Sequence, residues 1–188
     1  MLAAGQAGGC VEVVVVSVVP DFVPIPDDQS RFRRALSITL ANEGGASITN
    51  DADDPGGLTK WGISQRAFPD LDIQNLTFDG AAAIYLATYW RPIRADDLPE
   101  SLAIKLFDFA VNFGVSRAST MLQRSLNVLA GTMALSVDGR IGGVTVAAVS
   151  AERDPDALLC IVRYFAARHY VELGRTKYIR GWIKRAFA

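Results

Sequence analysis

The fold is decided by residues 31–64, RFRRALSITLANEGGASITNDADDPGGLTKWGIS. The first part of this stretch predicts a helix over residues 31–42 with one buried face, because apolar side chains recur at helical spacing in Phe32, Leu36 and Leu40. The pair Gly44-Gly45 is a strong stop signal for that helix. The Asp, Pro and Gly residues that follow predict a sharp turn with short β-structure on either side.

Glu43 lies between the end of this helix and the glycine pair. It follows Phe32 by about three helical turns at roughly 100° per residue, which predicts that it lies on the buried face. Burial and the negative end of the helix dipole both favour the protonated carboxyl group. An acid that stays neutral at about pH 6 to 7 suits general acid catalysis of glycoside cleavage. Glu43 is therefore a candidate catalytic acid, and a solvated helix-terminal Glu is the ordinary alternative.

An acidic segment follows Glu43. Residues 54–57 (DPGG) predict a turn, with candidate strands over residues 47–50 and 58–63. Glycoside hydrolysis usually requires a second carboxylate, which stays ionised and acts as base, nucleophile or stabiliser. Asp51 and Asp54 are the two candidates for that role. Their separation from Glu43, and with it the choice between retention and inversion, stays open.

A calcium loop is the competing interpretation of the same aspartates. Counted from Asp51, an EF-hand would place Asp53 at position three and Gly56 at position six. Position five is Pro55 and position twelve is Gly62, so two necessary ligands are missing. We therefore expect no metal here, and a solvated Asx-rich turn is the plain alternative.

Several motifs in order resemble one family of enzymes. Glu43-Gly44-Gly45, Asn50-Asp51 and residues 54–63 (DPGGLTKWGI) resemble the catalytic segment of glycoside hydrolase family 108 N-acetylmuramidases, which include phage-type endolysins and secretion activator proteins. Trp90-Arg91-Pro92 and residues 108–114 (DFAVNFG) resemble later signatures of that family. The peptidoglycan-binding module that commonly follows is similar to residues 122–126 (LQRSL) and 138–145 (DGRIGGVT), and residues 181–183 (GWI) resemble the usual C-terminal ending.

The resemblance implies a mainly α, lysozyme-like helical fold with a small β-hairpin after the first helix. It also implies that Glu43 is the catalytic residue and that no cofactor takes part. The expected substrate is peptidoglycan, cleaved at the β-1,4 bond between N-acetylmuramic acid and N-acetylglucosamine. We expect an irregular extension over residues 1–29, a lysozyme-like catalytic region over residues 30–113, and a helical peptidoglycan-binding module over residues 114–188, packed on the catalytic region.

Five further residues are candidates for binding the sugar. Trp61 and Tyr89 carry rings that stack on sugar faces, although core packing is the ordinary role of such rings. Thr59 either bonds the substrate or holds the hairpin. Asp108 and Asn112 are four apart in a predicted helix, hence on one face, and either line the cleft or bond a loop backbone.

The remainder of the chain is predicted to be helical, over residues 78–90, 99–113, 118–129, 143–150, 154–173 and 178–187. In these helices we expect Trp182 and Phe187 to be packed and Cys160 to be a small core residue. The single histidine, His169, is expected to be structural or exposed. No disulfide framework is predicted from Cys10 and Cys160.

Composition excludes several partners. The net charge is −1 and the pI about 5.8, so the charge of the chain gives no indication of nucleic acid binding. The basic C-terminal end, residues 175–185, is interpreted as a solvated helix face. The valine run over residues 13–19 is too short to span a membrane and has no preceding Lys or Arg. We therefore expect no stable membrane insertion and no standard signal peptide.

The expected partner is the glycan strand of peptidoglycan, bound by a monomer. The family pattern implies synthesis in the cytoplasm and action in the periplasm or cell wall, with help from a holin or a secretion system. The alternative is a non-catalytic wall-binding or secretion-accessory protein that keeps the groove. A peptidase or amidase would need a metal or nucleophile constellation, which we do not find in the sequence.

Overall fold

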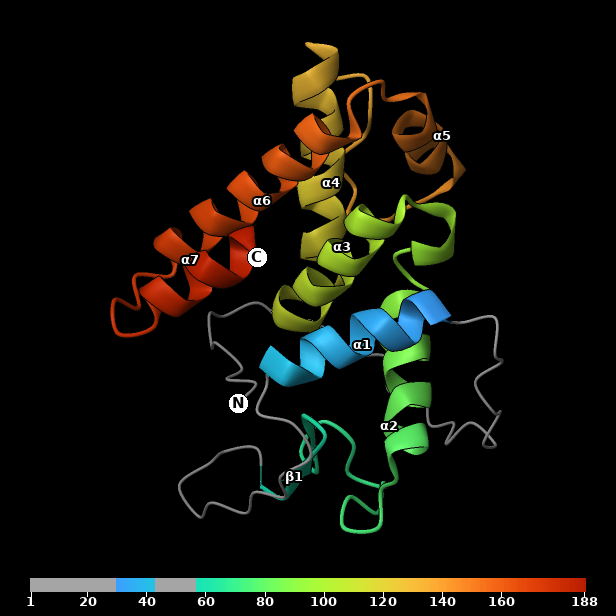
Figure 1. Cartoon of the computed structure of the whole chain (residues 1–188), viewed down its shortest axis with the longest axis vertical. Helices are drawn as coiled ribbons and strands as arrows, with labels where there is room; N and C mark the ends of the chain where they lie inside the picture. Colours follow the sequence, from blue (N-terminus) through green and yellow to red (C-terminus); the bar gives the residue numbers. More distant parts are fainter. Residues whose placement is uncertain (1–29, 43–56) are drawn as a thin grey trace. The chain divides into compact units, whose positions relative to one another are not determined.

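The computed structural model describes residues 30–42 and 57–188 (Figure 1). The chain divides after Leu86 into two compact units. The described residues are mainly helical, and a two-stranded antiparallel sheet follows the first helix, as the sequence predicts. No helix in residues 30–42 and 57–188 is long and apolar enough to cross a membrane.

The first unit contains α1 (Ser30–Asn42), β1 (Thr59–Lys60), β2 (Ile63–Ser64) and α2 (Phe78–Tyr85). α1 confirms the predicted helix, and its apolar stripe is buried, since Phe32 and Leu36 are 0% exposed and Leu40 is 5% exposed. α2 begins at a capped end, because the Thr77 hydroxyl accepts a hydrogen bond from the Gly80 amide at 3.1 Å. α1 crosses α2, and Arg33 lies 4.0 Å from Asp79 (Figure 1).

The hairpin of the first unit is tighter than the sequence suggests. The prediction of one strand over residues 58–63 is wrong, because this stretch folds back on itself in two strands with Lys60 opposite Ile63. The turn between them is Trp61-Gly62, and both residues have positive φ, 54° and 73°. Two successive residues with positive φ form a type I′ turn, whose twist suits a two-residue hairpin. The predicted strand over residues 47–50 and most of the predicted turn over 54–57 lie outside the described residues.

The second unit is built from helices. They are η1 (Leu86–Trp90, a π-helical turn that continues α2 and begins with the last residue of the first unit), η2 (Ala95–Asp97), α3 (Glu100–Phe113), α4 (Val115–Ala130), α5 (Gly143–Ala151), α6 (Pro155–Glu172) and α7 (Ile179–Phe187). Its core lies between α3, α4 and α6, and its large buried side chains include Phe107, Phe109, Leu122, Leu158 and Tyr170. α7 packs along α6 (Figure 1).

Two helix ends in this unit follow the expected signals, whereas α4 begins at Val115, three residues before the predicted start at residue 118. α3 ends before Gly114, and α6 begins with Pro155. The Asp154 carboxylate caps α6 by accepting from the Ala157 amide at 2.9 Å. The helix expected over residues 78–90 changes to π-helical geometry at Leu86, and the expected loop after it contains η2.

Two burial predictions are wrong. Cys160 is exposed, because the buried line of α6 runs through Leu158, Val162 and Ala166, and a residue two positions from Leu158 points about 200° away from it. Phe187 is 53% exposed. Trp182 is packed as expected, with its ring stacked on that of Tyr170 at 5.2 Å.

Candidate active site

The three predicted catalytic carboxylates, Glu43, Asp51 and Asp54, lie outside the described residues, and their roles stay predictions. The elements on both sides of this segment in the sequence are described. α1 ends at Asn42, immediately before Glu43, and the hairpin follows from Thr59. Both flanking elements belong to the first unit.

Thr59 begins the first strand of the hairpin and is half-buried. Its hydroxyl donates to the Gly57 carbonyl at 3.2 Å, so it helps to hold the chain where it runs into the hairpin. Lys60 secures the same strand by donating from Nζ to the Gln74 carbonyl at 2.9 Å. A bond from Thr59 to a sugar stays a prediction.

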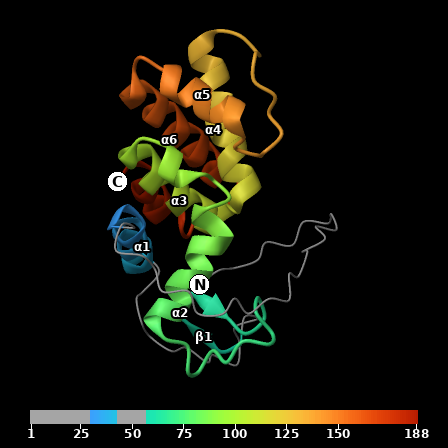
Figure 2. The ribbon, with the colours of Figure 1, turned by 90° about the vertical axis from the view of Figure 1, so that its right-hand side faces the viewer.

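Trp61 occupies the first position of the hairpin turn. Its φ of 54° is left-handed, which is uncommon for a bulky residue. Its carbonyl accepts a hydrogen bond from the Tyr85 hydroxyl at 3.0 Å, and its half-buried ring meets Phe78 edge-on at 5.2 Å. Figure 2 shows the hairpin beside α2, which carries Phe78 and Tyr85. Backbone strain of this kind costs about 1–3 kcal/mol and is concentrated at functional sites, so it favours a role for Trp61 beyond packing.

Gly62 is the residue on which this turn depends, and Gly62→Ala is expected to lower the free energy of unfolding by about 2–5 kcal/mol. An L-residue with left-handed φ costs about 1–2 kcal/mol, and forcing an atom into filled space adds about 1–3 kcal/mol. A Cβ at Gly62 would lie 2.6 Å from the Tyr85 hydroxyl oxygen. Urea unfolding measures the change.

Gly174→Ala is the matched control for Gly62→Ala. Gly174 has a similar φ of +65°, but a Cβ there would meet no atom within 4 Å. Its replacement is expected to cost only the conformational part, about 1–2 kcal/mol. Tyr85→Phe in the Gly62→Ala background should recover part of the larger loss, because the next Tyr85 atom lies 3.9 Å away. Equal losses for the two glycines would show that no steric conflict exists at Gly62.

Tyr89 lies on η1, in the second unit. It is half-buried, and burial raises the pKa of its hydroxyl above the ordinary value. Stacking of its ring on a sugar stays a prediction.

Asp108 is buried in the second unit, with 1% of its surface exposed. Its carboxylate accepts from Arg185 of α7, with Nη2 at 2.8 Å and Nε at 3.1 Å. When the Asn112 amide is turned so that its oxygen faces Arg185, that oxygen accepts from Nε at 2.8 Å. Asp108 and Asn112 share one face of α3, as predicted, and together they bind the guanidinium that joins α3 to α7. Contact of either side chain with substrate stays a prediction.

Lys105 adds a second cation to this cluster. Its Nζ donates to the Arg185 carbonyl at 3.1 Å and lies 4.0 Å from the Asp108 carboxylate. Burial lowers the pKa of the Lys105 ammonium, and the Asp108 charge opposes that shift. Among the described residues, the Asp108 carboxylate contacts both the Lys105 ammonium and the Arg185 guanidinium.

Gln123 and Asn127 are two structural residues of α4 whose role sequence reasoning missed. Gln123 is buried and donates to the Asp138 carboxylate at 2.7 Å and the Arg140 carbonyl at 2.9 Å. Asn127, one turn later, makes two 2.9 Å bonds to the backbone of Leu135. The two amides hold the loop between α4 and α5. The sequence did contain a signal for this role, because polar residues within the apolar face of a helix indicate buried hydrogen bonds.

His169 is predicted from the sequence to be either structural or exposed. It is half-buried, and its ring meets the Phe113 ring edge-on, with the ring centres 5.0 Å apart. Burial, followed by the charge of Arg117, lowers the pKa of the imidazole. Within residues 30–42 and 57–188, no group of three or more His, Cys, Asp or Glu residues is arranged to hold a metal ion.

Comparison with known proteins divides the chain into two matching segments. Residues 36–114 match the family described as glycosyl hydrolase 108, and residues 117–187 match the family described as predicted peptidoglycan domain. A solved structure described as that of Brucella abortus SagA is similar with a TM-score of 0.64 and 26% sequence identity, over 85% of this chain and 95% of that chain. No curated protein matches the chain significantly. The first match includes the hairpin, and the second includes Gln123 and Asn127.

Proposed function

We propose that the chain is an N-acetylmuramidase, because residues 36–114 match the glycosyl hydrolase 108 family and residues 117–187 match a predicted peptidoglycan domain. A glycoside hydrolase that carries such a domain is a peptidoglycan hydrolase. The proposal adds the bond that is cleaved, which is the β-1,4 bond between N-acetylmuramic acid and N-acetylglucosamine. The family match over residues 36–114 carries the proposal, because it covers every predicted site residue.

In the proposed mechanism Glu43 donates its proton to the oxygen of the leaving sugar as the glycosidic bond breaks. Asp51 or Asp54 stays ionised and either stabilises the cationic transition state, attacks the anomeric carbon, or activates water. The buried apolar stripe of α1 supports this assignment, because it orients the helix that leads directly to Glu43. The reaction requires no metal and no cofactor.

The sugar-binding part of the proposal has its best support at the hairpin. We assign Trp61 to stacking on a sugar ring, because its left-handed backbone lies at the tip of the turn and its indole is only partly buried, with a buried Nε1 that has no hydrogen-bond partner among the described residues. Thr59, Tyr89, Asp108 and Asn112 are the further candidates. Asp108 is the weakest of these, since its carboxylate is buried and bound to Arg185.

The two family matches also support a proposal for organisation and place of action. A catalytic region over residues 30–113 hydrolyses the wall, and a helical module over residues 114–188 binds it and packs on the catalytic region. The substrate lies in the periplasm or cell wall, so a monomer made in the cytoplasm reaches it through a holin or a secretion system.

Product analysis tests the proposed bond specificity. Purified peptidoglycan is digested with the protein, reduced with borohydride and examined by mass spectrometry. The expected products are glycan fragments with reduced N-acetylmuramic acid at their ends. Reduced N-acetylglucosamine would indicate a glucosaminidase, and free stem peptides would indicate an amidase or peptidase. Binding to sacculi without release of any product would indicate a wall-binding accessory protein, and each of these results contradicts the proposal.

A further inference from the structure

The C-terminal end of the chain has a charge unlike that of the whole. Residues 173–188 contain no acidic residue and five basic ones, although the chain has a net charge of −1: Arg175, Lys177, Arg180, Lys184 and Arg185. Arg185 points inward to Asp108. The other four are exposed, and none of them forms an ion pair with any residue in the described part of the chain. We call these four residues the basic stripe.

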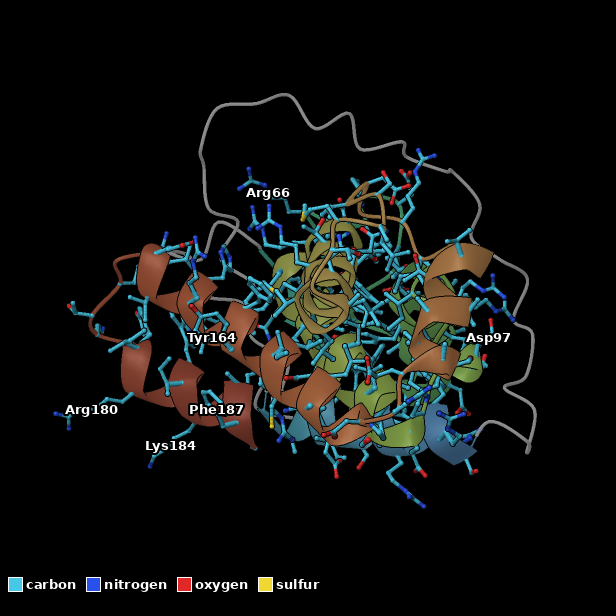
Figure 3. The ribbon with its side chains drawn as sticks, turned by 90° about the horizontal axis from the view of Figure 1, so that it is seen from above. Arg66, Asp97, Tyr164, Arg180, Lys184 and Phe187 are labelled. Carbon is cyan, nitrogen blue, oxygen red and sulfur yellow. The ribbon has the colours of Figure 1, made fainter. Side chains whose placement is uncertain are left out.

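Two cations of the basic stripe, Arg180 and Lys184, lie on α7. Arg180 and Lys184 are four residues apart, and Phe187 follows three residues later, so the three side chains lie on one face of the helix. Figure 3 shows Arg180 and Lys184 pointing away from the ribbon. The opposite face is occupied, because Ala186 is buried and Trp182 stacks on Tyr170. Arg180 and Lys184 are therefore accessible to a partner while the helix stays packed, and Lys177 lies just before α7 with its Nζ 5.3 Å from the centre of the Tyr178 ring.

Exposed aromatic rings accompany these cations. Phe187 is 53% exposed and Tyr178 is 45% exposed. Lys and Arg beside exposed aromatic side chains are typical of surfaces that lie against a lipid bilayer, where rings enter the headgroup region and cations meet anionic lipids. A soluble polyanion would use the charges alone and would gain little from an exposed phenylalanine.

We propose that the basic stripe, together with Phe187, binds the surface of a bilayer that contains anionic phospholipids. Each cation near such a surface raises the partition coefficient by about five-fold, so four cations and one ring give weak, reversible binding. The binding falls steeply with salt, because exposed charges are screened. Such binding would concentrate the hydrolase at the bilayer that borders its substrate. It does not depend on Glu43 or on the proposed bond specificity.

Vesicle sedimentation with the full chain tests this proposal. Vesicles of phosphatidylcholine alone are compared with vesicles that also contain phosphatidylglycerol, at low and at high salt. The wild-type protein is expected to bind only the anionic vesicles and only at low salt. Replacing Arg180 and Lys184 together by Gln should lower the partition coefficient by about 25-fold, the product of two five-fold losses. Phe187→Ala should cause a further, smaller loss.

The matched control replaces two exposed arginines of the same unit, Arg140 and Arg153, by Gln and so changes the net charge equally. It should bind the anionic vesicles like the wild type. Thermal unfolding of every variant separates lost binding from lost folding. The proposal is wrong if the wild type does not bind anionic vesicles at low salt. It is also wrong if the partition coefficient of the control falls as much as that of the variant with Arg180 and Lys184 replaced. An unchanged partition coefficient for Phe187→Ala, with full competition by soluble polyphosphate, would identify a polyanion site instead.

Discussion

Replacement of Glu43 by Gln is expected to lower the rate of peptidoglycan hydrolysis by about 10²- to 10⁴-fold, the usual contribution of a positioned general acid. Glutamine keeps the shape of the side chain but cannot give a proton to the leaving oxygen. The helix that leads to this position ends at Asn42 and buries Phe32 and Leu36 completely. The rate is measured as reducing ends released from purified peptidoglycan.

Glu100→Gln is the matched control for this experiment. Glu100 is exposed in the first turn of α3, so the same chemical change there should leave the rate unaltered. Binding of the Glu43→Gln variant to sacculi should persist, because the proposed wall-binding module is intact. Wild-type release of reducing ends by a folded Glu43→Gln variant would remove Glu43 from the mechanism.

The largest effect on stability is expected for Asp108→Asn, a loss of about 3–5 kcal/mol in the free energy of unfolding. Asparagine keeps the shape of the side chain and removes its charge. Arg185 and Lys105, whose side chains are only 13% and 10% exposed, then lose the negative charge of Asp108, and removing one partner of a buried ion pair is costly. Urea unfolding, with the midpoint and slope fitted together, measures the loss.

A second Asp–Arg pair provides the control. Arg94 and Asp97 are 2.7 Å apart, as close as Arg185 and Asp108 at 2.8 Å, but their side chains are 41% and 45% exposed. Asp97→Asn should cost only about 0–1 kcal/mol, because water solvates the remaining charge. Burial is the main difference between the pairs. Similar losses for both variants would show that the Asp108 cluster is not the buried anchor of α7.

Helix positions were predictable because their signals are local. The stripe of Phe32, Leu36 and Leu40 repeats within a single helix. The pair Asp154-Pro155 marks a helix start, because Asp is a good N-cap residue and Pro is favoured at the first helical position. The motifs that resemble glycoside hydrolase family 108 also lie within short segments, and the family match over residues 36–114 confirms that resemblance.

The hairpin shows where local signals fail. Residues 58–63 contain Leu, Trp and Ile, which favour a strand, and no Asn-Gly or Asp-Gly pair announces a turn. The turn nevertheless forms at Trp61-Gly62, with the Tyr85 hydroxyl bound to the Trp61 carbonyl at 3.0 Å. Tyr85 is 24 residues away in the chain, so no short window of sequence contains this contact.

The chain alone thus specified the helices, their caps, the order of its family motifs and the position of a candidate acid after the first helix, because periodicity and capping act over a few neighbouring residues. Tertiary packing decided that Trp61 adopts a left-handed turn, that Cys160 and Phe187 face outward, and that Asp108 binds an arginine 77 residues away. The physical reason is that burial and charge pairing depend on which surfaces meet in space, and those surfaces come from distant parts of the chain.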